Sequence, residues 1–172
     1  AHKIKDSGYL YWREGSGWSI SPNVLHGLEV WLKLCKNQKL PISEWKNFSK
    51  ITQPHVFTKH GRKALNSLDP EKLYSIDHMG DCLNVSAETH WDQVVKVSSK
   101  ELTYIRSVRR SGEKILSQKN PRIKISTIHK AKGGEADNVL LLLESSRACL
   151  DSLDQDSEIR TFYVGATRAK KQ

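Results

Sequence analysis

The longest uninterrupted apolar stretch in the chain is the five-residue run VLLLL at positions 139–143. Five residues are far too few to cross a bilayer, which takes about 20 residues as a helix. A run of this length suits a strand that is buried on both faces of a parallel sheet. A glycine-containing loop precedes it. It is followed by a helical pattern that begins with acidic residues and includes Phe162, Tyr163 and Ala166. This order predicts an α/β unit and no contact with a membrane.

Composition fits a folded soluble chain of one compact domain or two small ones, with 172 residues, 37% of them hydrophobic and 27% charged. No secretory signal opens the sequence. The three cysteines, Cys35, Cys82 and Cys149, show no CxxC spacing, so we expect neither a disulfide framework nor a zinc ribbon. The seven histidines form no set of metal ligands either. We therefore expect no metal site on this chain and a reducing, cytoplasmic location.

The positive charge is confined to one segment. The chain carries a net charge of +9, and residues 96–132 alone hold eleven basic and two acidic residues, so the remainder is neutral. One interpretation is a solvated helix face, which is the usual fate of charge runs. The other is a track for the phosphate backbone of a nucleic acid. Composition by itself leaves both open.

Helical spacing dominates the middle of the chain, between two strand-bearing ends. Short strands near Tyr9–Trp12 and Trp18–Ile20 flank a glycine-rich turn, and Ser21-Pro22 predicts the start of a helix that runs to about Cys35. Further helices are expected from Ser43 as an N-cap, over 58–68, over 69–76, from Trp91, and over 100–110. The last of these would direct three basic side chains outward: Arg106, Arg109 and Arg110.

Two stretches carry residues suited to phosphate chemistry. The first, STIHKAKGGEADNV at 126–139, combines a hydroxyl, an imidazole, lysines, paired glycines and a carboxylate in one loop. Glycines let the backbone approach a phosphate closely and lysines neutralise it. The second, RTFYVGATRAK at 160–170, presents Arg168 near the end of a helix, where its planar guanidinium can bind phosphate oxygens.

In order and spacing these stretches resemble motifs V and VI of the superfamily 1 DNA helicases related to UvrD, Rep and PcrA. The family forms TxHxAKGxE and YVGxTRA both occur, at 127–135 and 163–169. The resemblance implies an α/β fold with a partial RecA-like parallel sheet and helices, plus an inserted all-helical subdomain. By this resemblance, residues 1–20 begin the second RecA-like domain, residues 21–119 form the helical insertion, and residues 120–172 complete the domain with both motifs.

The resemblance also implies roles for individual residues. Arg168 would be catalytic, reaching the γ-phosphate of ATP from the opposite domain, and Glu135 would bind the ATP ribose. The other implied nucleotide-site residues are Lys132, Gly133 and Gly134, although the family commonly has an apolar residue at the position of Gly134. The DNA-binding residues would be Thr127, His129 and Lys130, joined by the arginines Arg106, Arg109 and Arg110 of the basic segment.

Neither a GxxxxGK[S/T] phosphate-binding loop nor a DExx-type pair for Mg²⁺ occurs in the sequence. In the family both belong to the N-terminal RecA-like domain, so ATP and Mg²⁺ would be held mainly there. The sequence is accordingly interpreted as a C-terminal fragment that hydrolyses no ATP alone. Its parent enzyme would move 3′-to-5′ on single-stranded DNA and unwind duplex DNA, in repair or replication.

Two alternatives remain open from the sequence. One is a helicase–nuclease subunit of the AddA or RecB kind. The other is a non-catalytic nucleic-acid-binding module that has kept helicase motifs without a motor.

Overall fold

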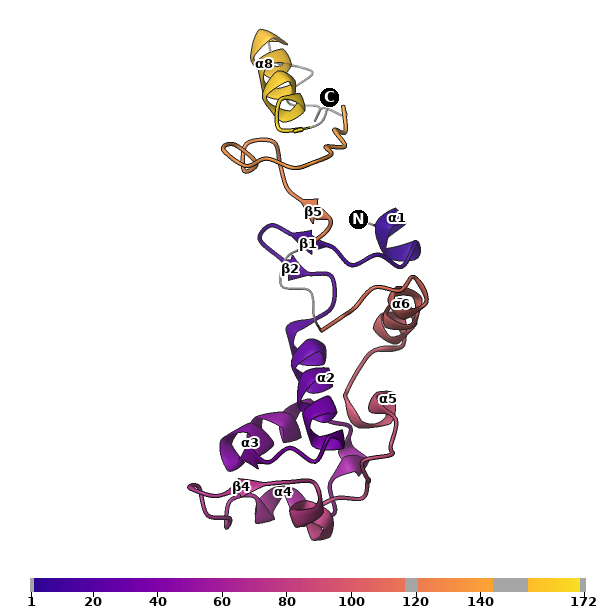
Figure 1. The fold of residues 1–172 in the computed structure, drawn as a ribbon, viewed down its shortest axis with the longest axis vertical. Coiled ribbons are helices and arrows are strands. Elements are labelled where there is room, and N and C mark those ends of the chain that lie inside the picture. Colours follow the sequence, from indigo (N-terminus) through magenta and orange to yellow (C-terminus); the bar gives the residue numbers. More distant parts are fainter. Residues whose placement is uncertain (1, 117–120, 144–154, 171–172) are drawn as a thin grey trace. The chain divides into compact units, whose positions relative to one another are not determined.

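The computed structural model describes residues 2–116, 121–143 and 155–170. The described chain mixes short strands with helices (Figure 1). It forms two compact units, residues 1–123 and residues 124–172. The expected domain boundaries after residues 20 and 119 stay predictions.

The first unit contains most of the secondary structure. Its elements, in chain order, are α1 (His2–Asp6), β1 (Trp12–Arg13), β2 (Gly17–Trp18), α2 (Pro22–Cys35), β3 (Leu40–Pro41), α3 (Ile42–Ile51), the 3-10 turn η1 (Pro54–Val56), α4 (Gly61–Ala64), β4 (Leu73–Tyr74), the 3-10 turn η2 (Asp77–Cys82), α5 (Trp91–Val94) and α6 (Ser99–Arg110).

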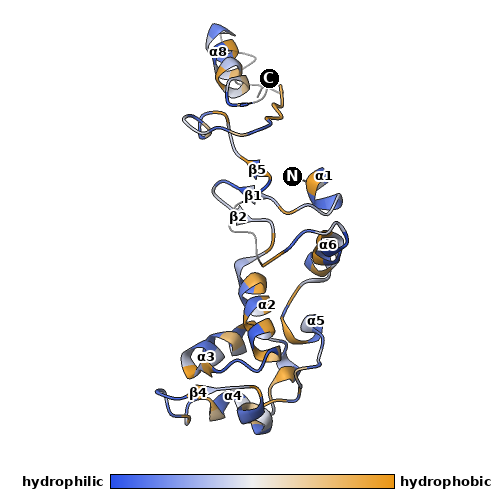
Figure 2. Ribbon diagram, viewed as in Figure 1, coloured by the Kyte–Doolittle hydropathy of each residue, from blue (hydrophilic) through white to orange (hydrophobic). Residues whose placement is uncertain are grey.

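Helix α2 confirms the prediction from Ser21-Pro22 and the apolar spacing. Proline at the first helical position is favoured because its missing N–H would have no partner there, and its φ already suits a helix. The side chain of Ser21 does not cap the helix; instead its backbone N–H donates to Oε1 of Glu101 at 2.7 Å. Hydrophobic and hydrophilic residues occupy different sides of α2 (Figure 2). The helix is therefore amphipathic, with its apolar side buried.

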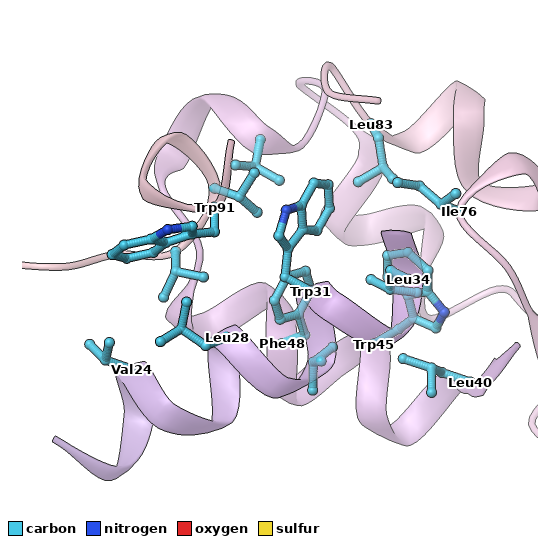
Figure 3. Packing of buried hydrophobic residues seen from close by; sticks show 14 of the residues in the cluster. Val24, Leu28, Trp31, Leu34, Leu40, Trp45, Phe48, Ile76, Leu83 and Trp91 are labelled. Carbon is cyan, nitrogen blue, oxygen red and sulfur yellow. The ribbon is translucent and has the colours of Figure 1, made fainter. Parts of the chain in front are cut away.

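The core of the first unit is built around aromatic rings (Figure 3). Trp31 of α2 lies parallel to Phe48 of α3, with ring centroids 6.3 Å apart, and Trp45 meets Phe48 edge-on at 6.3 Å. The indole N–H of Trp31 donates to the carbonyl of Thr89 at 3.1 Å, and that of Trp45 donates to the carbonyl of Tyr74 at 3.0 Å. Both rings are thus buried with their polar atom satisfied, as buried tryptophans require.

Three local predictions in this region are wrong. Ser43 lies inside α3, whose N-cap is Pro41, and the helix expected over 58–68 is reduced to α4. In place of a helix over 69–76, β4 pairs antiparallel with β3, with Leu40 opposite Tyr74. Pairing across more than thirty residues is a tertiary contact that local periodicity does not report. Because this ribbon lies within residues 21–119, that segment is not all-helical.

At the other end of the first unit, β1 and β2 form the predicted antiparallel hairpin. Trp12 lies opposite Trp18, and Gly15 and Gly17 adopt φ values of 80° and 76° that favour glycine in the turn. Helix α6 fastens this end to the chain that precedes it, because the Tyr104 hydroxyl donates to the carbonyl of Tyr9 at 2.7 Å. The predicted helix over 100–110 is confirmed, with Tyr104, Ile105 and Val108 buried.

The second unit contains β5 (Lys124–Ile125) and α8 (Gln155–Ala166), and α8 confirms the helix predicted around Phe162 and Tyr163. The strand expected over 139–143 is wrong: these residues are not in a strand, and Leu140 is 90% exposed. An apolar run becomes a buried strand only where neighbouring strands pair with it. Among the described residues of this unit the parallel pairing is one bridge, Ala136 with Ala169, and no RecA-like parallel sheet is formed there.

Candidate nucleotide and nucleic-acid site

The loop with the sequence TIHKAKGGE folds as consecutive turns. The N–H of Ala131 donates to the carbonyl of Thr127 at 3.0 Å, and the N–H of Gly134 donates to the carbonyl of Ala131 at 3.0 Å. Gly133 has a φ of 82°, a conformation that glycine adopts without strain. Satisfying the backbone in this way leaves four side chains on the outside of the loop, all of them exposed: Thr127, His129, Lys130 and Lys132.

The helix of the second motif packs against this loop through a glycine. Gly165 is buried, and a Cβ atom at its position would lie 2.9 Å from Cδ1 of Leu141 and 3.3 Å from Cγ1 of Ile128. Only a residue without a side chain allows α8 to approach this closely. Gly165 therefore fixes the distance between the two motifs.

Backbone hydrogen bonds also join the two motifs. The N–H of Ala136 donates to the carbonyl of Arg168 at 3.0 Å, and the N–H of Lys170 donates to the carbonyl of Ala136 at 2.9 Å. The residue after Glu135 is thus bonded directly to Arg168. Side chains of the two motifs also meet, because Nζ of Lys170 lies 3.7 Å from Oε2 of Glu135. Both are largely exposed, so this ion pair contributes little to stability.

The Arg168 guanidinium is held against its own helix. Its Nε donates to the carbonyl of Val164 at 3.1 Å, and its Nη2 donates to Oγ1 of Thr167 at 3.2 Å. The Thr167 hydroxyl in turn donates to the carbonyl of Val164 at 3.0 Å. A cation near the C-terminal end of a helix is favoured by the helix dipole, which accounts for this placement.

The arginines of the basic segment lie on α6 in the first unit. The N-cap Ser98 accepts a hydrogen bond from the N–H of Glu101 at 3.2 Å and so fixes the start of the helix. Arg106, Arg109 and Arg110 are exposed, as predicted. Arg109 and Arg110 occupy the last turn, where positive charge complements the helix dipole.

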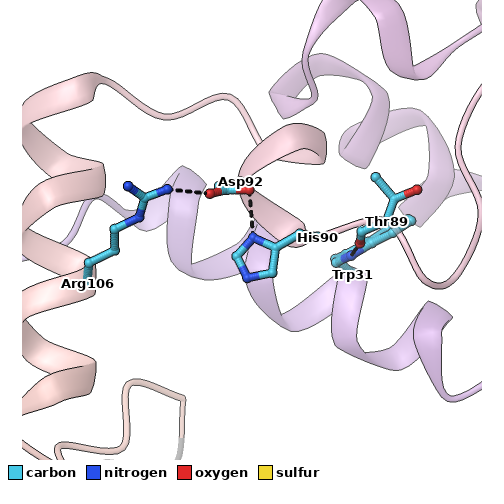
Figure 4. A network of polar contacts seen from close by, with 5 residues as sticks. All are labelled: Trp31, Thr89, His90, Asp92 and Arg106. Atoms are coloured by element: carbon cyan, nitrogen blue, oxygen red, sulfur yellow. Dashed lines mark hydrogen bonds and ion pairs between the residues drawn. The ribbon is translucent and has the colours of Figure 1, made fainter.

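Arg106 is engaged by an acidic residue that the sequence did not single out. Its Nη2 lies 2.9 Å from Oδ2 of Asp92, and Oδ1 of Asp92 lies 2.6 Å from Nδ1 of His90 (Figure 4). The hydrogen bond with His90 is the largest cause that holds the pKa of Asp92 below its ordinary value. Burial opposes that shift, and the hydrogen bond from Arg106 adds to it. Asp92 is therefore an anion that neutralises Arg106.

Sequence reasoning missed both carboxylate contacts for different reasons. Lys170 follows Arg168 closely in the sequence, so its nearness to Glu135 follows once the two motifs are known to meet. Asp92 and Arg106 are fourteen residues apart on separate helices, and no spacing rule connects them.

The described residues supply only part of a nucleotide site, namely groups for the ribose and for a phosphate. Glu135 is an exposed carboxylate that can accept from ribose hydroxyls, and Arg168 supplies donors for phosphate oxygens. Within the described ranges no three His, Cys, Asp or Glu side chains gather as they would around a metal ion. The same ranges contain no helix long and apolar enough to cross a membrane.

Residues 25–172 match the family model of the UvrD-like helicase C-terminal domain. The match covers most of the chain, and the chain belongs to this family. Neither the curated proteins nor the solved structures compared with it contain a match.

Proposed function

We propose that this chain works as the second motor domain of a UvrD-like DNA helicase that couples ATP hydrolysis to movement along single-stranded DNA. The observation that carries the proposal is the backbone bridge between Ala136 and Ala169. It joins the segment that begins with Thr127 and His129 to the segment that contains Arg168. A change in the position of one of these segments therefore moves the other.

In this proposal the two motifs divide the work. Thr127, His129 and Lys130 contact single-stranded DNA, while Lys132, Gly133, Gly134 and Glu135 face the nucleotide. ATP supplies the phosphoryl group that is transferred to water. ATP and its Mg²⁺ ion are held mainly by the N-terminal RecA-like domain. Arg168 exchanges its bonds to Val164 and Thr167 for oxygens of the γ-phosphate and stabilises the charge that develops there.

Duplex DNA ahead of the motor and 3′-to-5′ movement belong to the same proposal. They rest on membership of the helicase family and on the exposed cations of the loop and of α6. Because these 172 residues contain no GxxxxGK[S/T] phosphate-binding loop, they should not hydrolyse ATP alone. DNA-stimulated hydrolysis by these 172 residues that Arg168→Ala abolishes would contradict this division of labour.

The DNA-binding part is tested by fluorescence anisotropy of labelled single-stranded DNA over a range of salt concentrations. Each phosphate contact contributes about 0.7 to the slope of log affinity against log salt. The variant Lys130→Ala should therefore lower the magnitude of the slope by roughly 0.7 and weaken binding similarly for all sequences.

The matched control is Lys36→Ala, which removes one exposed lysine that lies outside the basic segment. It should leave the slope unchanged. Equal effects of the two variants would show that the loop has no special role in binding DNA.

A further inference from the structure

A pocket of about 260 Å³ lies in the first unit, between the β1–β2 hairpin and the start of α2. Its lining includes Leu10 and Ile20, which are buried, and Trp18 of β2. Leu25, Ile115 and Leu116 complete the apolar lining. Two polar side chains of α2, His26 and Glu29, also line the pocket and are exposed.

Trp18 differs from Trp31 and Trp45, two tryptophans of the core. The indole N–H groups of Trp31 and Trp45 donate to backbone carbonyls, and both rings are almost completely buried. Trp18 is only half-buried, and within the described part of the chain its indole N–H makes no hydrogen bond. Its ring thus lines a cavity instead of filling one.

The pocket suits a small, flat, heteroaromatic ligand. An indole beside aliphatic side chains offers a stacking surface, and the carboxylate of Glu29 accepts hydrogen bonds from ring or exocyclic N–H groups. Lys33 lies 2.9 Å from Oε1 of Glu29 and orients that carboxylate. A mostly apolar lining with a small number of polar groups is the usual composition of a ligand site.

Cations on the chain segment next to the pocket suit a ligand that is part of a polyanion. Ile115, which lines the pocket, directly follows a segment that carries three exposed cations, Arg109, Arg110 and Lys114. Glu113 within that segment is buried and lies 3.4 Å from Arg122, so its charge is not presented to solvent. The chain segment that leads into the pocket lining therefore carries cations that can bind the phosphates of a base held there.

We propose that the pocket beside Trp18 holds one unpaired nucleobase of single-stranded DNA. The proposal rests on the DNA-binding function proposed above and adds a base-binding position in the first unit, separate from the two helicase motifs. It gives Trp18 a role other than core packing.

The test compares two fluorescently labelled oligonucleotides of equal length, one with thymine bases throughout and one abasic in its central part. Trp18→Leu should weaken binding of the first about tenfold, within the range for loss of one base–aromatic stack. The same variant should leave binding of the abasic oligonucleotide unchanged. Leu25→Phe, which fills the pocket from α2, should reproduce this difference even if Trp18→Leu disturbs the hairpin.

The matched control is Trp12→Leu, the same substitution directly opposite Trp18 in the hairpin but outside the pocket. It should not discriminate between the oligonucleotides. The pocket assignment is overturned if Trp18→Leu and Leu25→Phe weaken both oligonucleotides equally or neither, or if Trp12→Leu alone discriminates. In each of those cases DNA binding by the wild-type chain still stands, whereas a wild-type chain that binds neither oligonucleotide overturns the proposed function as well.

Discussion

At the scale of single residues, Gly165 controls the contact between the two helicase motifs. Valine at this position would place methyl groups where Leu141 and Ile128 already lie. Overpacking of this kind costs about 1–3 kcal/mol, and here it would push α8 away from the loop. We expect Gly165→Val to loosen the bridge, so that the amide protons of Ala136 and Lys170 exchange with solvent at least about tenfold faster.

Amide exchange followed by NMR measures this effect directly. Gly134→Val is the matched control, because Gly134 has room for a Cβ, whose nearest neighbour would be the carbonyl of Ala131 at 3.4 Å. Unchanged exchange at both bridge amides in Gly165→Val would show that this glycine does not set the distance between the motifs.

At the scale of elements, the contact between α5 and α6 decides which arginines are available to DNA. Asp92 neutralises Arg106, while Arg109 and Arg110 lie in the last turn of α6. A phosphate must displace the Asp92 carboxylate before it can bind Arg106. We therefore expect Arg106→Ala to weaken binding of single-stranded DNA less than Arg109→Ala does, in anisotropy titrations at low salt.

Asp92→Asn provides the converse test. It removes the negative charge and leaves a side chain of the same size, so DNA binding should become tighter and the salt slope steeper by up to about 0.7. Equal losses for the two arginine variants, together with no gain in Asp92→Asn, would contradict the neutralisation of Arg106.

Elements that depend on local sequence patterns could be predicted from the sequence, and elements that depend on pairing with distant residues could not. The amphipathic spacing of α2, α6 and α8 is sufficient to identify these helices, because a helix forms its hydrogen bonds within itself. By contrast, β4 depends on β3, and the apolar run at 139–143 has no partner strand among the described residues. The site shows the same division. The motif pattern placed Arg168 and Glu135 in one region, but Asp92 and the pocket beside Trp18 depend on packing between separate elements.

At the scale of the whole molecule, the two units differ in how much they bury. The first unit contains a large aromatic and aliphatic core, including Trp31, Trp45 and Phe48, whereas Gly165 is the one buried residue among the described residues of the second unit. Local opening is least costly where few apolar contacts are buried. We expect amides in α2 and α3 to exchange with solvent on the order of a hundredfold more slowly than those in α8.

Hydrogen exchange with mass spectrometry tests this expectation and links stability to function. Addition of single-stranded DNA should slow exchange at 127–132 and at 109–116, because bound phosphates and a bound base order both segments, and should leave α3 unchanged. Lys36→Ala should give the wild-type pattern in both conditions. Comparable exchange in α3 and α8 without DNA would contradict the difference in core between the units. Protection by DNA confined to α3 would contradict the DNA-binding surfaces assigned to 109–116 and 127–132.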